Sequence, residues 1–211
     1  LSDIDIEKAV KKGDITLEPF DKKRLQPVSY DIRLGNKFIV NDEGATHIID
    51  PVKKIYAKTR EIIVKDGDEF VLHPGVSVLG VSKEFFGSNH YVIQIGGKSS
   101  LARVGLMIHN TAGIANPGHF LHLTLELSNQ NNVPIIIRPG MEIAQLMFSM
   151  LSSPRVRTTL LSVSPSLGSV TWTSASIVEF AAQRKPWQWP SAWTLKRICG
   201  TLSVIWIVPP V

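Results

Sequence analysis

Hydrophobic and polar residues follow a helical period only at the start of the chain. Ile6 and Ala9 lie three residues apart, as on one face of an amphipathic helix. Ser2 and Asp5 have the spacing of a capping box, and Gly13 follows two lysines as it would at a helix end. The pattern therefore predicts a short N-terminal helix.

From Ile15 onward the pattern changes to short runs in which apolar and polar residues alternate, as in half-buried strands. Turn residues separate the runs, with Gly35-Asn36, Asp66-Gly67 and Pro74-Gly75 as the clearest pairs. The predicted strands cover residues 29–34, 37–40, 47–49, 61–64, 69–72, 76–81, 91–95, 106–110, 122–128, 134–137 and 143–148. This succession predicts a mainly β domain.

Charge divides the chain near residue 152. Residues 1–150 carry 17 basic and 17 acidic side chains, whereas residues 151–211 carry 6 basic ones and a single acidic one, Glu179. The net charge of +5 therefore belongs to the last part of the chain. A nucleic-acid partner, which a basic protein would suggest, is not expected for the neutral first part.

Residues 153–211 also differ in composition, because they contain all five tryptophans of the chain. We expect a linker over 162–169, a weak helix over 176–184 and an apolar run over 202–208 that is too short to cross a bilayer. Three interpretations of this tail stay open: an appendage that binds a partner or a membrane surface, a poorly ordered extension, and a translated reading-frame error. The domain itself is predicted to cover residues 1–152.

The sequence excludes several classes of protein. No run of about 18 apolar residues predicts a membrane span, and the first residues lack the basic start of a secretory signal, so a cytoplasmic location is expected. Cys199 is the single cysteine, which rules out an intrachain disulfide and a Cys-x-x-Cys zinc site.

Two stretches suggest chemistry. Gly96 and Gly97 read as a tight turn that opens onto a short helix, where Ser99 or Ser100 would cap and free N–H groups would bind an anion. Glu126 lies in an alternating, mostly apolar run, where a carboxylate is unusual unless it has a specific role. Such a carboxylate suits a group that both accepts and donates a proton.

Several motifs in a fixed order make a resemblance specific. They are Gln26 to Gly35, His73 to Gly75, Lys98 to Leu106, Thr111 to Gly113 and Leu123 to Asn129. Together they resemble the dCTP deaminase branch of the dUTPase-like superfamily, over roughly residues 1–152. The resemblance implies a distorted β jelly-roll and a homotrimer with active sites between subunits. It also implies binding of dCTP with Mg²⁺ on the triphosphate, and deamination to dUTP and ammonia without zinc or another catalytic metal.

The resemblance also implies catalytic roles. Glu126 would shuttle protons, and Arg103 would position and polarise it. Ser99 and the carbonyl of Ala112 would hold the attacking water. From the residues alone, Glu126 could instead be a surface side chain and Arg103 an interface ion pair, so these alternatives stay open.

The remaining expected site residues bind the nucleotide. By similarity, Ser99 and Ser100 hold phosphate oxygens, Lys98 and Arg103 add positive charge, and Thr111 and Asn116 belong to the nucleotide site. A plain helix cap would give the same pattern at the two serines.

Five other polar residues are interpreted as structural. Asp31 and Arg33 alternate onto one face of their strand, as a buried ion pair or an intersubunit contact would. His109, His119 and His122 lack the helical spacing of metal ligands, so packing or hydrogen bonding is the preferred interpretation.

Two departures from the family limit the predicted function. Asn116 stands where relatives have an aspartate that activates water for diphosphate release, and an amide cannot accept that proton. The lid that relatives carry after residue 154 is not recognisable. The main prediction is therefore a dCTP deaminase that makes dUTP. The alternatives are a bifunctional deaminase and diphosphatase that makes dUMP, and a catalytically weak nucleotide-binding module.

Overall fold

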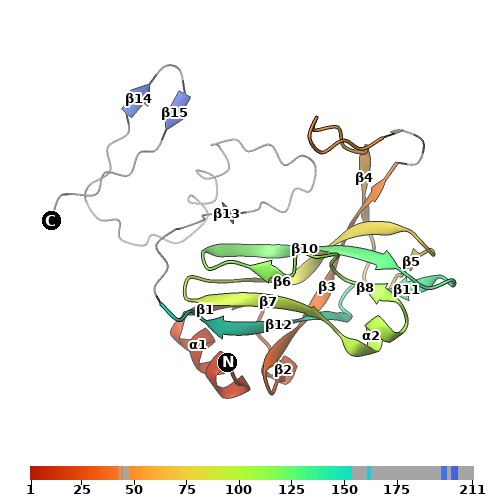
Figure 1. The fold of residues 1–211 in the computed structure, drawn as a ribbon. Helices are drawn as coiled ribbons and strands as arrows, with labels where there is room; N and C mark the ends of the chain where they lie inside the picture. Colours follow the sequence, from red (N-terminus) through yellow and green to blue (C-terminus); the bar gives the residue numbers. More distant parts are fainter. Residues whose placement is uncertain (43, 45–47, 154–160, 163–195, 199–200, 204–211) are drawn as a thin grey trace. The chain divides into compact units, whose positions relative to one another are not determined.

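The computed structural model describes residues 1–42, 44, 48–153, 161–162, 196–198 and 201–203 (Figure 1). The chain divides into two compact units, Leu1–Pro165 and Ser166–Val211. In the second unit, β14 (Lys196–Ile198) and β15 (Thr201–Ser203) form an antiparallel pair. The helix predicted over 176–184, the linker beyond residue 162 and the apolar run beyond residue 203 lie outside the described residues.

The first unit is mainly β, as the sequence predicts. Its helices and strands, in chain order, are α1 (Asp3–Lys12), β1 (Ile15–Glu18), the 3₁₀ helix η1 (Lys22–Arg24), β2 (Leu25–Gln26), β3 (Ser29–Asn41), β4 (Thr59–Ile63), β5 (Phe70–Leu72), β6 (Ser77–Ser88), β7 (Tyr91–Gly97), α2 (Ser99–Arg103), β8 (Leu106–Met107), β9 (Ile114–Ala115), β10 (His119–Asn129), β11 (Ile135–Ile137), β12 (Glu142–Met150) and β13 (Leu161–Ser162). Within the described residues, no helix is long and apolar enough to cross a membrane.

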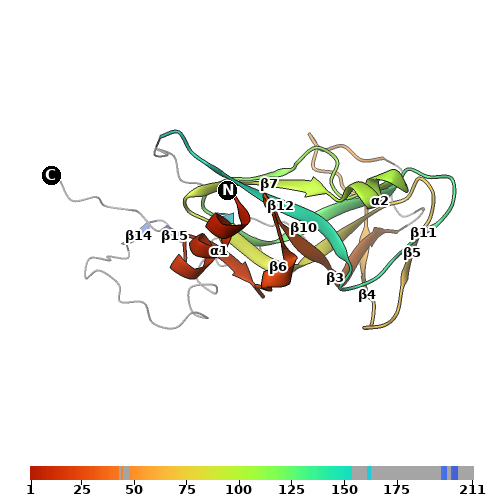
Figure 2. The same ribbon diagram turned by 90° about the horizontal axis from the view of Figure 1, so that it is seen from below.

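Helix α1 forms where the capping residues place it. The Ser2 hydroxyl accepts a hydrogen bond from the Asp5 backbone N–H, and Gly13 ends the helix in the left-handed conformation at φ 84°. Ile6 and Ala9 are buried, so the predicted apolar stripe faces the core. The two helices lie at opposite ends of the unit (Figures 1 and 2).

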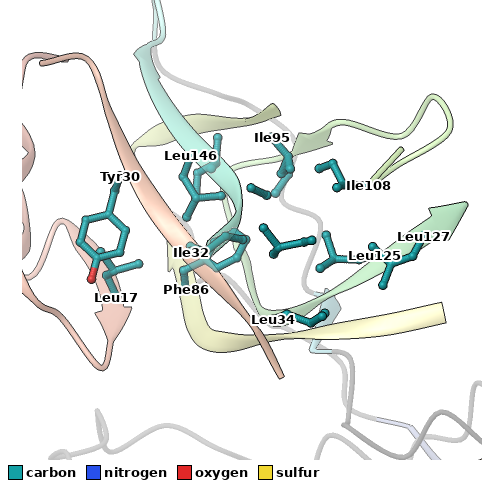
Figure 3. Close-up of a cluster of buried hydrophobic side chains, with 14 of the residues drawn as sticks. Leu17, Tyr30, Ile32, Leu34, Phe86, Ile95, Ile108, Leu125, Leu127 and Leu146 are labelled. Atoms are coloured by element: carbon teal, nitrogen blue, oxygen red, sulfur yellow. The ribbon is translucent and has the colours of Figure 1, made fainter. Parts of the chain in front are cut away.

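Most strands of the first unit form one strongly curled sheet, whose main path has the order β13-β10-β6-β3-β12-β7-β9, while β5 and β11 form a separate antiparallel pair. Apart from β13, which pairs with β10 in parallel, neighbours along this path run antiparallel. Side chains from β3, β6, β7, β10 and β12 gather in one apolar core (Figure 3). Leu34, Leu125 and Leu127 are fully buried there, and each such side chain stabilises the fold by about 1.5–3 kcal/mol.

The turn predicted at Gly35-Asn36 is wrong, because residues 29–34 and 37–40 belong to the single strand β3. Gly35 is required there for close packing. A Cβ atom at Gly35 would lie 2.8 Å from Val81 Cγ1 and 2.9 Å from Val81 O on the neighbouring strand. The turns at Asp66-Gly67 and Pro74-Gly75 are confirmed.

Some predicted strands differ in length or are absent. The strand expected over 47–49 does not form at Ile48 and Ile49, which are exposed, and an isolated bridge between Asp50 and Ile55 closes the chain there instead. The strand expected over 106–110 ends at Met107. β1 and β9 were not predicted. The two residues of β9 are too few to show alternation, whereas the four residues of β1 do alternate and were missed.

Candidate active site

Strand β7 leads directly into helix α2, which is the short helix expected after the glycine pair. Gly96 and Gly97 are the last residues of β7, opposite Gln145 and Ala144 of β12. The tight turn predicted at these glycines is therefore wrong. Both glycines extend strand β7, which was expected to end at Ile95, and both pair with β12. The change of direction falls at Lys98.

Lys98 is the N-cap residue of α2, and it makes no side-chain capping bond. The prediction that Ser99 or Ser100 caps the helix is wrong, because both serines already lie in its first turn. Both are exposed, and within the described residues neither hydroxyl has a hydrogen-bond partner. Their hydroxyl groups are thus available to a ligand.

The Lys98 ammonium group is held by two carboxylates. Its Nζ lies 2.6 Å from Asp31 Oδ2 and 2.8 Å from Glu142 Oε2. Glu142 Oε1 also contacts Arg24 Nη1 at 2.8 Å, and Gln26 Nε2 donates to Asp31 at 3.1 Å. Asp31 is buried, but the ion pair expected between Asp31 and Arg33 is wrong, because Asp31 pairs with Lys98 instead.

The contact between Lys98 and Glu142 contributes to pKa shifts at both residues. Burial acts to lower the pKa of Lys98, but its hydrogen bonds to Asp31 and Glu142 outweigh burial and raise that pKa above its ordinary value. The hydrogen bond from Lys98 lowers the pKa of Glu142. Lys98 and Glu142 are therefore both charged near neutral pH.

Arg33 belongs to a different ion pair. Its Nε lies 2.7 Å from Glu84 Oε1, and its backbone N–H donates to Glu84 Oε2 at 2.6 Å. Glu84 is completely buried. The sequence did not single out Glu84, because a glutamate next to a lysine in an alternating run looks like a solvated position.

Glu126 lies on β10 between two fully buried residues, Leu125 and Leu127, and its own side chain is half-buried. Its Oε2 accepts a hydrogen bond from the backbone N–H of Asn110 at 3.1 Å. Asn110 immediately precedes Thr111 and Ala112. The fold therefore brings Glu126 next to the exposed segment that was expected to hold water and nucleotide.

Among the described residues, Glu126 contacts the Asn110 N–H and forms no ion pair with Arg103. Arg103 is exposed at the end of α2, and in the part of the chain that the structure describes it has no ion-pair partner. Asn116 is also exposed, in a turn that the His119 N–H closes on the Asn116 carbonyl at 3.0 Å. The expected site residues thus fall into two groups, one on α2 and one around Glu126.

The three histidines have separate surroundings. His122 Nδ1 lies 3.2 Å from the Ser82 carbonyl, and its ring lies beside Phe85. His109 and His119 each have one buried ring nitrogen without a partner, and burial lowers the pKa of His119. Among the described residues, no group of three or more His, Cys, Asp or Glu side chains could hold a metal ion.

Comparison with known proteins gives close relatives in sequence. The chain is 46% identical over 156 residues to a protein named "dCTP deaminase, dUMP-forming" from Corynebacterium efficiens, a match that covers 73% of this chain and 80% of the relative. It is 44% identical over 155 residues to a protein of the same name from Tropheryma whipplei, with 73% and 79% covered.

A solved structure supports the fold. The crystal structure of 2'-deoxycytidine 5'-triphosphate deaminase from Agrobacterium tumefaciens matches with a TM-score of 0.54 at 22% identity. The match covers 70% of this chain and 45% of that chain, so this chain spans less than half of its length. The expected dUTPase-like jelly-roll is confirmed at the level of the fold.

The family assignment follows from a match along most of the chain. The model of the family described as dCTP deaminase-like matches residues 1–151, which include β3, α2 and β10 with all the motifs described above. The chain belongs to the dCTP deaminase-like family of enzymes.

Proposed function

We propose that this chain deaminates dCTP and hydrolyses the resulting dUTP to dUMP and diphosphate. The observation that carries the proposal is the identity of 44–46% to relatives whose names describe them as dUMP-forming. The sequence alone favoured dUTP as the final product. The relatives support the bifunctional alternative over that prediction.

Glu126 would act as the proton shuttle in deamination. It would take one proton from the attacking water as oxygen bonds to C4 of cytosine and deliver it to N3. It would then take the second proton from the resulting C4 hydroxyl and deliver it to the amino group, whose bond to C4 breaks, so that water and dCTP give dUTP and ammonia. The contact with the Asn110 N–H supports this role, because it fixes one carboxylate oxygen and leaves the other for water. General acid–base catalysis of this kind contributes about 10²- to 10⁴-fold in rate.

Nucleotide and water would be held by the groups on either side of Glu126. The Ala112 carbonyl and Ser99 would orient the water, while Ser100 and Arg103 would bind phosphate oxygens. Mg²⁺ would enter with the triphosphate and neutralise part of its charge. Thr111 completes the proposed nucleotide site.

We further propose a homotrimer in which α2 of one subunit completes the site around Glu126 of another. The exposed guanidinium group of Arg103 has no ion-pair partner among the described residues, which supports this arrangement because the group is available to a second chain. Lys98, by contrast, already contacts two carboxylates, so its contribution to phosphate binding is the weakest of the expected roles. The cytoplasmic location stays a prediction.

Asn116 is the residue that makes the second reaction demanding. Attack of water on phosphorus needs a group that accepts a proton, and an amide cannot provide it. The proposal therefore requires that another carboxylate or the bound metal supplies this function. An Asn116→Asp variant should hydrolyse added dUTP to dUMP faster than the wild type does.

The test is product analysis after incubation with dCTP and Mg²⁺. Equal amounts of ammonia, dUMP and diphosphate are expected, with loss of at least about 100-fold in rate for Glu126→Gln. The exposed residue Glu18 provides the control, because Glu18→Gln should retain the wild-type rate.

The other outcomes separate the alternatives. Formation of ammonia and dUTP without dUMP would show that the chain catalyses deamination only. Binding of dCTP without any turnover would support a nucleotide-binding module. Full activity of Glu126→Gln would show that the shuttle has been assigned to the wrong residue.

A further inference from the structure

Strand β6 loses its regular pairing with both neighbours at the same place. On one side, His122 of β10 pairs with Phe85 and Thr124 pairs with Val81, so that the single residue Leu123 faces the three residues 82–84. On the other side, the pairing of β3 with β6 changes between Leu34 and Phe38. A bulge of this kind leaves backbone groups without their ladder partners.

The Ser82 side chain replaces the missing partners on the β10 side. Its hydroxyl accepts a hydrogen bond from the Leu123 N–H at 2.7 Å and donates to the Glu84 carbonyl at 2.7 Å. Ser82 is 2% exposed, so water does not compete for these groups. One buried hydroxyl thus joins the two edges of the bulge.

The Glu84 side chain supplies hydrogen-bond partners on the β3 side. Its carboxylate accepts from both the backbone N–H and the Nε of Arg33, at 2.6 and 2.7 Å. Because Glu84 is completely buried, this bidentate contact also satisfies its charge. The junction of β3, β6 and β10 is therefore fully hydrogen-bonded through Ser82 and Glu84.

Regular pairing resumes immediately before the candidate catalytic residue. Thr124 pairs with Val81, and Glu126 pairs with Leu79 two positions further on. Without the bulge, Glu126 would instead face Val81, a displacement of about 7 Å along β6 at the usual rise per residue. The bulge therefore determines where along β6 the Glu126 carboxylate lies.

We infer that Ser82 is a positioning residue for Glu126: its buried hydroxyl holds the bulge that sets the register of β10. This inference rests on the proposed function, in which Glu126 is the proton shuttle. Ser82 touches neither substrate nor water, and it acts through Leu123 and the β10 backbone. Glu84 anchors the same junction to β3.

The test compares Ser82→Thr with Ser82→Val, which have the same size and branching and differ only in the hydroxyl. Ser82→Val should lower kcat for ammonia release by about 10- to 100-fold and change KM by less than about twofold, because misplacement of a catalytic group affects the chemical step. Ser82→Thr should stay within about threefold of the wild type. Rates are expressed per folded molecule, from circular dichroism at the assay temperature.

Three further measurements make the outcome unambiguous. Ser82→Ala repeats the comparison if the branched side chains do not fit, and Ser77→Ala, at the exposed start of β6, should leave kcat unchanged. Hydrogen exchange at the Leu123 amide should accelerate in Ser82→Val and Ser82→Ala but not in Ser82→Thr.

The inference fails if Ser82→Val and Ser82→Ala keep the wild-type kcat, or if Ser82→Thr and Ser82→Val lose activity equally. Glu126→Gln is assayed in parallel. If that variant is fully active, the proposed function is wrong, whereas its loss together with an active Ser82→Val would reject only the positioning role.

Discussion

At the scale of single residues, Lys98 shows how the fold changes the meaning of a motif. In the sequence it is a basic residue beside two serines, which favours a role in binding phosphate. In the structure its ammonium group contacts Asp31 and Glu142, which lie 67 and 44 residues away along the chain. Such partners lie far away along the chain and cannot be inferred from local spacing.

The Lys98 cluster gives a prediction for stability against pH. The pKa of Glu142 is lowered from its ordinary value of 4.5 in the folded chain, chiefly by the hydrogen bond from Lys98. A lowered pKa stabilises the folded state above the unfolded value, and this contribution is lost as pH falls through the folded value. The Glu142→Gln variant should therefore have a lower free energy of unfolding than the wild type at neutral pH, by about 1 kcal/mol or less. This difference in free energy should shrink below about pH 4.5.

The measurement is thermal unfolding of both proteins from about pH 7 to about pH 3.5. The control is the same pair of proteins in a Lys98→Gln background, where the pH dependence of the difference should be much weaker because the hydrogen bond is gone. A difference that is constant over the whole range would contradict the assignment.

At the scale of elements, the sequence predicts best where a local signal decides the structure. Helix α1 is set by Ser2, Asp5 and Gly13, and all three act as expected. Gly35 and Gly96 were misinterpreted as turn residues, since a sequence does not show whether a glycine makes a bend or continues a paired strand. The latter depends on a partner strand that lies far away in the chain.

The same reasoning explains which part of the candidate site was predictable. The types of residue were found from motifs, whereas the contact between Glu126 and the Asn110 N–H and the bulge at Ser82 depend on strand register. Register is set by pairing across the sheet. No local pattern in β6 marks Glu84 as buried.

Gly87 provides a prediction at this scale. A Cβ atom at Gly87 would lie 2.3 Å from the His119 carbonyl oxygen and 2.5 Å from Phe120 Cδ1, so β6 and β10 would have to separate. Gly87→Ala should lower the free energy of unfolding by about 3 kcal/mol, measured by urea titration.

The matched variant is Gly96→Ala, which also places a methyl group on a strand glycine. There the nearest atoms, on Gln145 and Met147, are at 3.4 Å, which is ordinary van der Waals contact. Its cost should stay below about 1 kcal/mol. Equal effects of the two substitutions would show that the loss of glycine, rather than the close approach of the strands, destabilises the fold.

At the scale of the whole molecule, the part of the chain with balanced charge coincides with the part that the family model matches. Residues 1–150 are electrically balanced, and the family model matches residues 1–151. Within this region, Glu126 is half-buried beside Asn110, while Arg103 is exposed without an ion-pair partner among the described residues. In the proposed homotrimer, a second copy of the chain would supply this guanidinium group.

Complementation between two inactive variants tests this arrangement. In the proposed trimer each site takes Glu126 from one subunit and Arg103 from another. Random mixing of equal amounts of Glu126→Gln and Arg103→Ala subunits leaves both groups intact in about a quarter of the sites, so about a quarter of the wild-type activity should return. The measurement is ammonia release from dCTP after mild denaturation and refolding of the mixture.

Each variant refolded alone is the control, and it should regain almost no activity. If both groups belonged to the same subunit, every subunit in the mixture would carry one defect and no activity would appear. Activity that rises with mixing and approaches a quarter therefore distinguishes a shared site from a site contained in one chain, because only a shared site allows each variant to supply the group that the other lacks.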